Sequence, residues 1–239
     1  MKAKFKKVMI PGYVLILSCF LLAGFGINNM VSTYADNALF GHRRCIVLDA
    51  GHGGIDGGAV SCTGAFESNI NLEIALRLDD LFHLLGIDTV MIRRTDCSVY
   101  TSGDTIAAKK VSDLKERVRI VNSANNAMLV SIHQNNFLDS RYSGAQVFYG
   151  NSPGSDLLAK AMQDRFVDVL NPGSNRQAKK ADGVYLMQHI SCTGVLVECG
   201  FLSNPQEEAK LRSDDYQKKI ACVIASVCSE ILHSGQEMA

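Results

Sequence analysis

Proline is scarce in this 239-residue chain, and neither sign of charge is in excess. Four prolines and 20 glycines are too few for a collagen-like or low-complexity architecture. A hydrophobic content of 47% and a formal net charge of zero exclude an intrinsically disordered chain, which needs fewer apolar residues and more net charge. The length allows one folded domain that buries roughly two-thirds of the surface its unfolded chain exposes.

The balanced charge hides an uneven distribution along the chain. The first seven residues contain four lysines and no acid, and the next 20 residues, 8–27, contain no charged side chain. The remainder therefore holds 20 of the 24 basic residues and all 24 acidic ones, a net charge of −4. A mildly acidic body argues against a nucleic-acid partner, because nonspecific binding depends on lysine and arginine neutralising phosphates.

The uncharged run 8–27 has the length of a helix that crosses a bilayer. The lysines before it predict a cytoplasmic N-terminus and an extracytoplasmic remainder, because basic flanks stay inside. We expect 1–27 to form a basic stub and a signal anchor, 28–43 a polar tether, and 44–239 the folded domain. The alternative is a signal peptide cleaved after Ala35, which would release the protein from the membrane.

Seven cysteines follow the apolar run, and none of them lies in a C-x-x-C motif. An odd number leaves at least one unpaired, and the spacing indicates neither a zinc ribbon nor a redox pair. Cys45, Cys199, Cys222 and Cys228 lie within apolar patterns, where a free cysteine behaves as a small hydrophobic residue. We therefore interpret the cysteines as mostly reduced and structural.

Strand and helix patterns alternate from Cys45 onward, and 97–110 is predicted to be a polar loop. Helical spacing and stop signals predict helices from Glu67 to Leu85, over 112–124 and 154–170, and after caps at Asn204 and Ser213. The predicted strands are short apolar runs at 45–50, 88–93, 127–133, 145–150 and 195–199. This alternation predicts a single α/β domain with a mostly parallel twisted sheet flanked by helices on both faces.

The start of the helix after Asn204 is well marked in the sequence. Asn204 is followed by Pro205 at the first helical position and by Glu207 at the third, an asparagine variant of the capping box. The sequence therefore predicts that Glu207 returns a hydrogen bond to the cap.

Polar side chains interrupt the apolar pattern where predicted strands end. The segment from Asp49 to Gly54 follows the first strand, the segment from Ser131 to Asn135 ends the third, and Glu198 lies in the last. Open α/β sheets place their sites at the carboxyl ends of parallel strands. Because Glu67 opens the first helix, it is expected at the same edge of the sheet.

Two histidines and one acid at this edge suggest a metal site. His52, His133 and Glu67 offer two nitrogens and one carboxylate, a set typical of catalytic zinc that leaves a fourth position for water. Glu198 interrupts an apolar strand, where burial of an acid costs free energy unless the acid is ion-paired or has a functional role. Beside a metal it could serve as a general base and then as the acid for a leaving amine.

Other interpretations of the same residues exist. The glycine-rich stretch after Asp49 could hold a phosphate, but it lacks GK[ST], and Asp56 replaces the third glycine of G-x-G-x-x-G. No G-x-S-x-G motif supports a serine nucleophile. Glu198 could instead be a structural acid in a salt bridge. The remaining histidines are interpreted as solvated side chains: His42, His83, His189 and His233.

Several motifs in order resemble those of one enzyme family. VLDAGHGGIDGGA, ESNINLEIALRL, IRRTD, LKERVRIVNSANNAMLVSIHQNN, SGAQVFY and VLVECGFLSNPQEEAKL are similar to the signatures of zinc-dependent N-acetylmuramoyl-L-alanine amidases. The resemblance covers about 45–233 and is strongest to the short, membrane-anchored subgroup that acts on spore-cortex peptidoglycan. It implies a zinc amidase catalytic domain over 44–239.

The resemblance implies roles for individual residues and a reaction. His52, Glu67 and His133 would hold one Zn²⁺ ion per chain, and Glu198 would be the catalytic acid and base. The reaction would hydrolyse the amide between N-acetylmuramic acid and L-alanine, removing stem peptides before muramic-δ-lactam formation in the spore cortex. The implied location is extracytoplasmic, in the intermembrane space of the developing spore. The alternatives are a zinc peptidase that cuts another wall amide and an inactive wall-binding relative.

The expected partners are peptidoglycan glycan strands with stem peptides and, through the N-terminal helix, the membrane. The glycine-rich loop around His52 is entropically costly to order, which predicts an extracytoplasmic accessory protein that enhances activity or zinc affinity. Gln134 stands where the family more often has alanine, and we expect this larger side chain to narrow or retune the substrate groove. The short 97–110 loop indicates no inserted helix that would block the groove.

Overall fold

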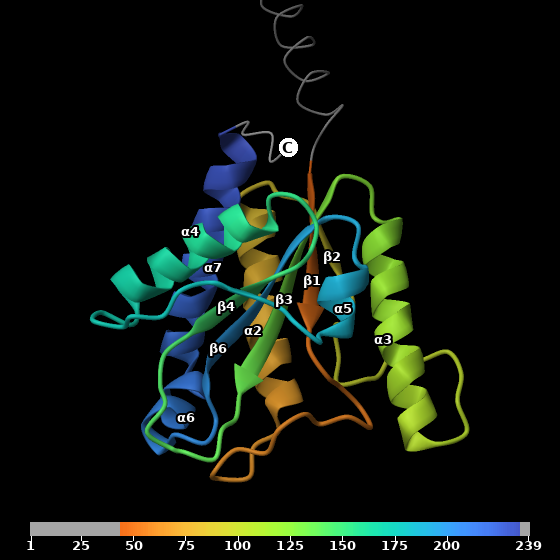
Figure 1. The fold of residues 1–239 in the computed structure, drawn as a ribbon, viewed down its shortest axis with the longest axis horizontal. Helices are drawn as coiled ribbons and strands as arrows, with labels where there is room; N and C mark the ends of the chain where they lie inside the picture. Colours follow the sequence, from red (N-terminus) through yellow and green to blue (C-terminus); the bar gives the residue numbers. More distant parts are fainter. Residues whose placement is uncertain (1–43, 235–239) are drawn as a thin grey trace, which may run out of the picture. The chain divides into compact units, whose positions relative to one another are not determined.

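The structure is a computed structural model that describes residues 44–234. Within this part of the chain, six strands form one sheet in the order β2-β1-β3-β6-β4-β5 (Figure 1). Strands β2, β1, β3 and β6 are mutually parallel, whereas β4 pairs antiparallel with β6 and parallel with β5. The prediction of a mostly parallel sheet is confirmed. The strands are β1 (Cys45–Ala50), β2 (Thr89–Met91), β3 (Ala127–Asn135), β4 (Gln146–Tyr149), β5 (Lys179–Lys180) and β6 (Thr193–Phe201).

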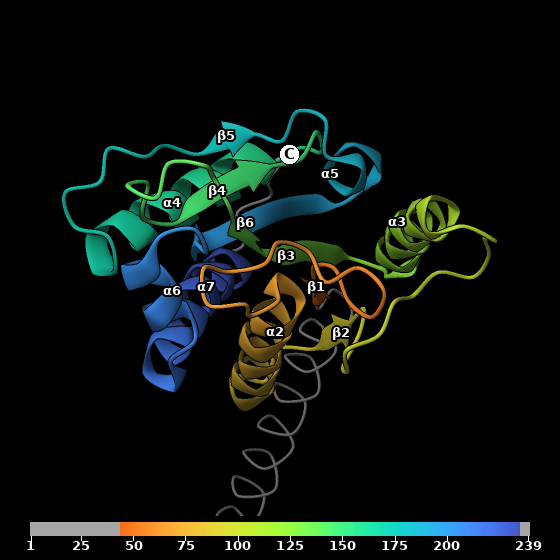
Figure 2. The ribbon, with the colours of Figure 1, turned by 90° about the horizontal axis from the view of Figure 1, so that it is seen from below.

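Helices cover both faces of the sheet, as the alternating pattern predicts. They are α2 (Glu67–Leu84), α3 (Ile106–Ser123), α4 (Ser155–Val169), α5 (Tyr185–His189), α6 (Pro205–Leu211) and α7 (Asp214–His233). Buried residues of α2, α4 and α7 share one core with the sheet, and those of α3 and α5 share the core on the opposite face. Figure 2 shows α2 on one side of the strands and α5 on the other.

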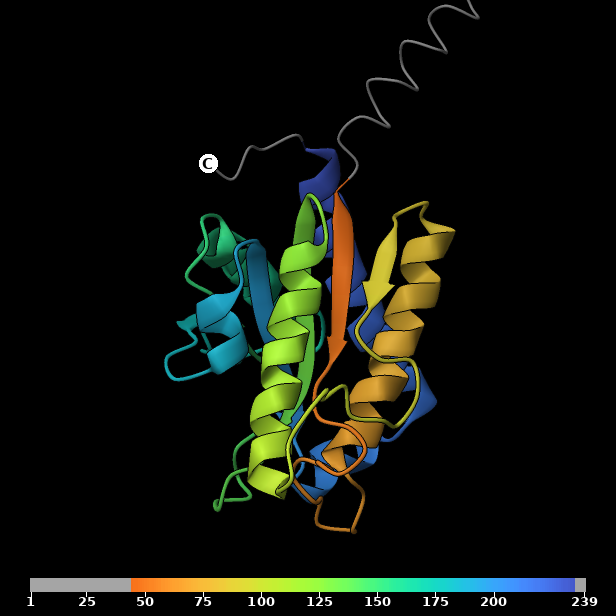
Figure 3. The same ribbon diagram turned by 90° about the vertical axis from the view of Figure 1, so that its right-hand side faces the viewer.

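The central strands read as continuous apolar runs because both of their faces are covered. In β1, Ile46 and Leu48 belong to the core beneath α2 and α7, while Val47 between them belongs to the core beneath α3. All three side chains are fully buried. Burial on both faces makes this sheet a rigid support for the loops at its edge, where the chain leaves β1 and β3 and where α2 begins (Figure 3).

Helix α3 begins six residues earlier than its apolar spacing indicates, so the predicted 97–110 loop is too long. Thr105 caps the helix by accepting a hydrogen bond from the backbone N–H of Ala108. Ile106 and Val111 in the first turns are exposed, so these turns carry no buried stripe that a sequence pattern could reveal. The short elements α5 and β5 were likewise not predicted, because five and two residues are too few to show a period.

Both predicted caps near the C-terminal end are present. Asn204 accepts hydrogen bonds from the backbone N–H groups of Gln206 and Glu207, and Ser213 accepts one from Tyr216. The prediction that Glu207 returns a hydrogen bond to the cap is wrong. The Glu207 carboxylate instead accepts hydrogen bonds from the backbone N–H groups of Gly144 and Phe201 and so ties the loop before β4 to the end of β6.

Cys199 and Cys228 are buried, as their apolar surroundings predict, but Cys222 is exposed. It lies on the outer side of α7, between the buried residues Ala221 and Val223 of the apolar face. The predicted membrane segment 8–27 and the tether 28–43 lie outside the described residues. Within 44–234, no helix is both long and apolar enough to cross a membrane.

Candidate metal centre

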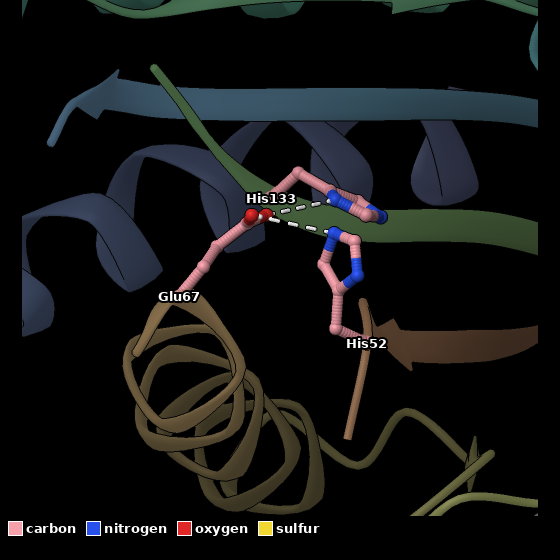
Figure 4. Close-up of side chains that lie close together, drawn as sticks. All are labelled: His52, Glu67 and His133. Atoms are coloured by element: carbon pink, nitrogen blue, oxygen red, sulfur yellow. Dashed lines mark hydrogen bonds and ion pairs between the residues drawn. The ribbon is translucent and has the colours of Figure 1, made fainter. Parts of the chain in front are cut away.

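Three elements bring His52, Glu67 and His133 together at the carboxyl edge of the sheet. His52 lies in the loop after β1, Glu67 is the first residue of α2, and His133 lies near the end of β3 (Figure 4). Nε2 of His52 is 3.3 Å from Oε2 of Glu67, and Nδ1 of His133 is 3.0 Å from Oε1 of Glu67. Each side chain offers one ligand atom, and these atoms all lie within 4.8 Å of one another.

This donor set fits a metal ion. Zinc binds histidine nitrogen and carboxylate oxygen at about 2.0–2.2 Å, which places two tetrahedral ligands roughly 3.4 Å apart. The two measured separations, 3.3 and 3.0 Å, are close to that value. Two neutral imidazoles and one carboxylate would leave a further coordination position open for substrate or water.

The other ring nitrogen of His52 is held by Asp56. Nδ1 of His52 is 3.0 Å from Oδ2 of Asp56, whose second oxygen lies 2.9 Å from Nζ of Lys110 on α3. A carboxylate on Nδ1 sets the tautomer that leaves Nε2 free as a ligand atom. Burial lowers the pKa of His52, but its hydrogen bonds to Glu67 and Asp56 outweigh this effect and raise that pKa to about 9, so a metal ion that binds Nε2 would displace a proton from it.

The Glu67 carboxylate is buried and fixed by the protein. The backbone N–H of Ala59 donates to Oε2 at 2.9 Å, and the backbone N–H of Gln134 donates to Oε1 at 3.1 Å. The side-chain amide of Asn71, one turn along α2, donates to Oε1 at 3.2 Å. Burial raises the pKa of Glu67, but its hydrogen bonds with the two histidines lower it by more, so the group is ionised and ready to bind a cation.

Glu198 lies beside this cluster. The register of the parallel strands β3 and β6 pairs His133 with Glu198, which places the two side chains on the same side of the sheet. Oε2 of Glu198 is inaccessible to solvent and has no hydrogen-bond partner in the described part of the chain. Burial raises the pKa of Glu198 to about 7, in the range suited to proton transfer near neutral pH. No lysine or arginine within 44–234 forms an ion pair with Glu198, so its interpretation as a salt-bridged structural acid finds no support.

Comparison with known proteins identifies the family. A sequence profile described as N-acetylmuramoyl-L-alanine amidase matches residues 46–228. The chain belongs to the N-acetylmuramoyl-L-alanine amidase family. It is 38% identical over 183 residues to the germination-specific N-acetylmuramoyl-L-alanine amidase of Bacillus subtilis (strain 168), a match that covers 76% of each chain.

Further relatives are consistent with this assignment. The amidase AmiA of Escherichia coli (strain K12) is 28% identical over 241 residues, which cover 81% of this chain and 78% of AmiA. The CwlD amidase from Clostridioides difficile, solved in complex with the GerS lipoprotein, is 39% identical with a TM-score of 0.76. That structural match covers 80% of this chain and 98% of CwlD.

The loop that carries His52 in this amidase is held in a strained conformation. His52 has a φ of 60°, in the left-handed region that a histidine rarely adopts. Arg117 of α3 donates to the carbonyl of His52 at 2.7 Å, and Arg93 donates to the carbonyls of Gly51 at 3.0 Å and Ala50 at 2.8 Å. Three consecutive carbonyls are therefore fixed by two buried guanidinium groups, which offsets the backbone strain.

Glycine is required directly before His52. A Cβ atom at Gly51 would lie 2.2 Å from Nε2 of His133, so any side chain here would displace a candidate ligand. Gly58 has a φ of +69°, and a Cβ atom there would lie 2.6 Å from Oε2 of Glu67. These two glycines let the backbone pass close to the side chains of His133 and Glu67, a requirement that the sequence pattern alone did not reveal.

Of the two effects expected of Gln134, a narrowing of the substrate groove is contradicted by the structure. Its side chain is buried, and its amide donates to Oδ1 of Asn71 at 3.2 Å. Alternation along β3 explains the difference, because Gln134 follows His133 directly and so points to the opposite face of the sheet. Through Asn71, Gln134 instead supports the Glu67 carboxylate from behind.

Several supporting residues were missed by sequence reasoning. Arg117 forms a buried ion pair with Asp49 of β1, and a second one with Asp113 at 2.6 Å. A signal was available for this cluster. Arg117 falls on the inward face of its helix and Asp49 ends an apolar strand, and charges at such positions need partners. Nothing in the spacing indicated which residues would pair.

The other described histidines take no part in the site. His83, His189 and His233 each place Nδ1 within 2.6–2.8 Å of the carbonyl four residues earlier in their own helix. All three side chains are exposed and make only these local helix contacts, in keeping with their interpretation as solvated side chains. His42 lies outside the described residues.

Proposed function

We propose that this protein uses one zinc ion to hydrolyse the amide between N-acetylmuramic acid and L-alanine in peptidoglycan. The proposal rests on one observation: a cluster of His52, Glu67 and His133 suited to zinc, with the unpartnered Glu198 on the adjoining strand. Family membership supports the choice of this amide bond. The two histidines and Glu67 would hold the ion.

The residues of the chain account for the proton transfers. When bound, zinc supplies Lewis acidity that makes the scissile carbonyl more electrophilic. The Glu198 carboxylate, which lines the cavity at the metal centre, accepts the proton of the attacking water, since burial makes it a stronger base than an ordinary glutamate. The same carboxylate then delivers the proton to the alanine nitrogen as the amide bond breaks, so Glu198 ends ionised as it began.

Product analysis tests this proposal. Peptidoglycan is digested with the purified protein, with and without zinc, and the muropeptides are examined by mass spectrometry. We expect free stem peptides with an L-alanine amino terminus and peptide-free muramic acid, in the zinc-containing digest. Cleavage within the stem peptide would indicate a zinc peptidase instead, and binding without cleavage would indicate an inactive wall-binding relative.

We also propose that the reaction serves the spore cortex, where removal of stem peptides precedes muramic-δ-lactam formation. The similarity to an amidase named germination-specific supports this setting. The uncharged run 8–27 supports a location outside the cytoplasm, anchored in the membrane of the developing spore. Fractionation of sporulating cells, with N-terminal sequencing of the recovered protein, would distinguish an anchor from cleavage after Ala35.

An extracytoplasmic accessory protein is a further part of the proposal. The CwlD amidase that this chain resembles was solved in complex with a lipoprotein. The strained, glycine-rich loop at His52 supports the same idea, because a partner that orders this loop would favour the zinc-binding conformation. Zinc titration of the protein alone tests it, since full occupancy and rapid turnover without a second protein would contradict the need for a partner.

A further inference from the structure

A cavity of about 350 Å³ extends from the metal centre toward α3 and α5. His52, His133 and Glu198 line one part of it, and Tyr100 and Lys109 line another. Its volume lies at the lower end of the range for small-molecule sites, which suits one or two amino-acid residues rather than a whole glycan strand. The peptide side of the substrate is therefore the better occupant.

The acids that line this cavity beside α3 are already paired. Asp56 contacts His52 and Lys110, at 3.0 and 2.9 Å. Asp49 pairs with Arg117, and Asp113 accepts hydrogen bonds from Arg117 and from the backbone N–H of Val99, both at 2.6 Å. These contacts also engage two of the three lysine and arginine side chains in the lining.

Lys109 is the remaining cation of the lining. Among the described residues, no carboxylate forms an ion pair with it, and its Nζ lies 5.1 Å from the centre of the Tyr100 ring. An aromatic face at this distance attracts an ammonium group and restricts its position without neutralising its charge. The side chain is thus held at the cavity wall with its charge available to a ligand.

Apolar side chains also line the cavity. Val184 directly before α5, Leu186 in α5 and Leu196 in β6 line it. Leu186 and Leu196 are buried, so this part of the wall offers no hydrogen bonds. A fitting ligand therefore combines a small apolar group with a negative charge.

We propose that Lys109 binds the free α-carboxylate of the second stem-peptide residue, with the methyl group of L-alanine against the apolar wall. This inference rests on the proposed function. In peptidoglycan the second residue is a D-glutamate linked onward through its side chain, so its α-carboxylate is free. It lies one residue beyond the scissile amide, a step of about 3.8 Å between Cα atoms.

Charge matching in the substrate gives a direct test. Initial rates are measured on glycan strands whose second stem residue carries either the α-carboxylate (D-isoglutamate) or the neutral α-amide (D-isoglutamine). For Lys109→Met we expect KM for the carboxylate substrate to rise about tenfold, the value of a charge-assisted hydrogen bond. KM for the amide substrate should stay within twofold, and Lys109→Arg should retain most of the preference for the carboxylate.

Lys115→Met is the matched control. Lys115 lies on the same helix, is exposed, and lines a different hollow beside Glu116 and Arg119. It should change KM for neither substrate, and thermal melts should show that all variants remain folded. Lys110 is unsuitable as a control because it contacts Asp56, which holds the candidate ligand His52.

The outcomes separate the subsite from the proposed function. If wild-type protein cleaves both substrates and Lys109→Met affects both equally, or neither, the subsite is wrong while the amidase activity stands. If wild-type protein that carries one zinc ion per chain cleaves neither substrate, the proposed function is wrong and the subsite falls with it. A selective loss on the carboxylate substrate supports both.

Discussion

His133 and Glu198 are paired residues on neighbouring parallel strands, β3 and β6. The candidate ligand and the candidate acid–base group thus owe their closeness to strand register and not to a flexible loop. Both strands are buried along their central residues, and this pair lies just beyond them, at the last regular step before the register shift that follows His133. Glu67 and His52 are then brought to this fixed pair by a helix start and a glycine-rich loop.

This arrangement predicts that catalysis and metal binding can be separated at Glu198. Glu198→Gln keeps the shape of the side chain but removes the proton acceptor, so the rate should fall by about 100- to 10,000-fold. Zinc content should remain near one ion per chain, because Glu198 is not among the proposed ligands. Rates of muropeptide release and elemental analysis measure the two quantities. A variant that keeps more than a few per cent of the wild-type rate would contradict the general-base role.

Asn71 should control metal affinity without touching the metal. Its amide donates to Oε1 of Glu67 and to the carbonyl of Gly51, both at 3.2 Å. Loss of such supporting contacts typically weakens metal binding by about 10- to 100-fold, and we expect this for Asn71→Ala. Zinc competition with a chelating dye measures the effect. Asn69→Ala is the control, because Asn69 is exposed on the same helix, and equal affinities for the two variants would refute the role of Asn71.

Zinc should stabilise the folded protein through the same residues. An ion that binds only the native state at a concentration 100 times its Kd adds about 2.7 kcal/mol, which raises Tm by several degrees for a domain of this size. His133→Ala should lose the shift along with activity. His189→Ala, which removes an exposed histidine on α5, should keep it. Equal shifts for all three proteins would mean that zinc binds elsewhere.

The Asp49–Arg117 ion pair should make the free energy of unfolding depend on pH in the acidic range. Burial raises the pKa of Asp49, but Arg117 and the Ser131 hydroxyl lower it by more, so it ends below its ordinary value near 4. A lowered folded-state pKa contributes stability that is fully present above the unfolded pKa and is lost as pH falls through the folded one. At pH 7, Asp49→Asn should lose roughly 3 kcal/mol, because it leaves a buried guanidinium without this partner.

Urea unfolding of wild type and Asp49→Asn at pH 7 and at several values below 4 tests this effect. The difference between the two proteins should shrink toward the acid end, where wild-type Asp49 also becomes neutral. Asp214→Asn is the control, since its ion pairs with Arg77 and Lys218 are exposed and should matter little. A difference that stays constant with pH would show that Asp49 contributes by packing alone.

The sequence by itself determined the order of the major elements and the candidate site. The apolar run 45–50 and the helical spacing after Glu67 are local signals. The folded protein forms a strand and a helix at these positions, as the signals predict. The rule that strand ends share one edge then brought His52, His133 and Glu198 together, because each follows or ends a parallel strand. Residue chemistry at those positions was enough to predict a metal centre, and the family followed from the resemblance of several motifs in order.

Only the tertiary structure decided which residues support the site. The pairing of Arg117 with Asp49 joins positions 68 residues apart, and no spacing rule predicts a partner at that distance. The face of Gln134 depended on strand alternation relative to His133, and the early start of α3 depended on a threonine cap with exposed turns behind it. Such contacts depend on three-dimensional packing, in which side chains meet across elements that a one-dimensional pattern treats separately.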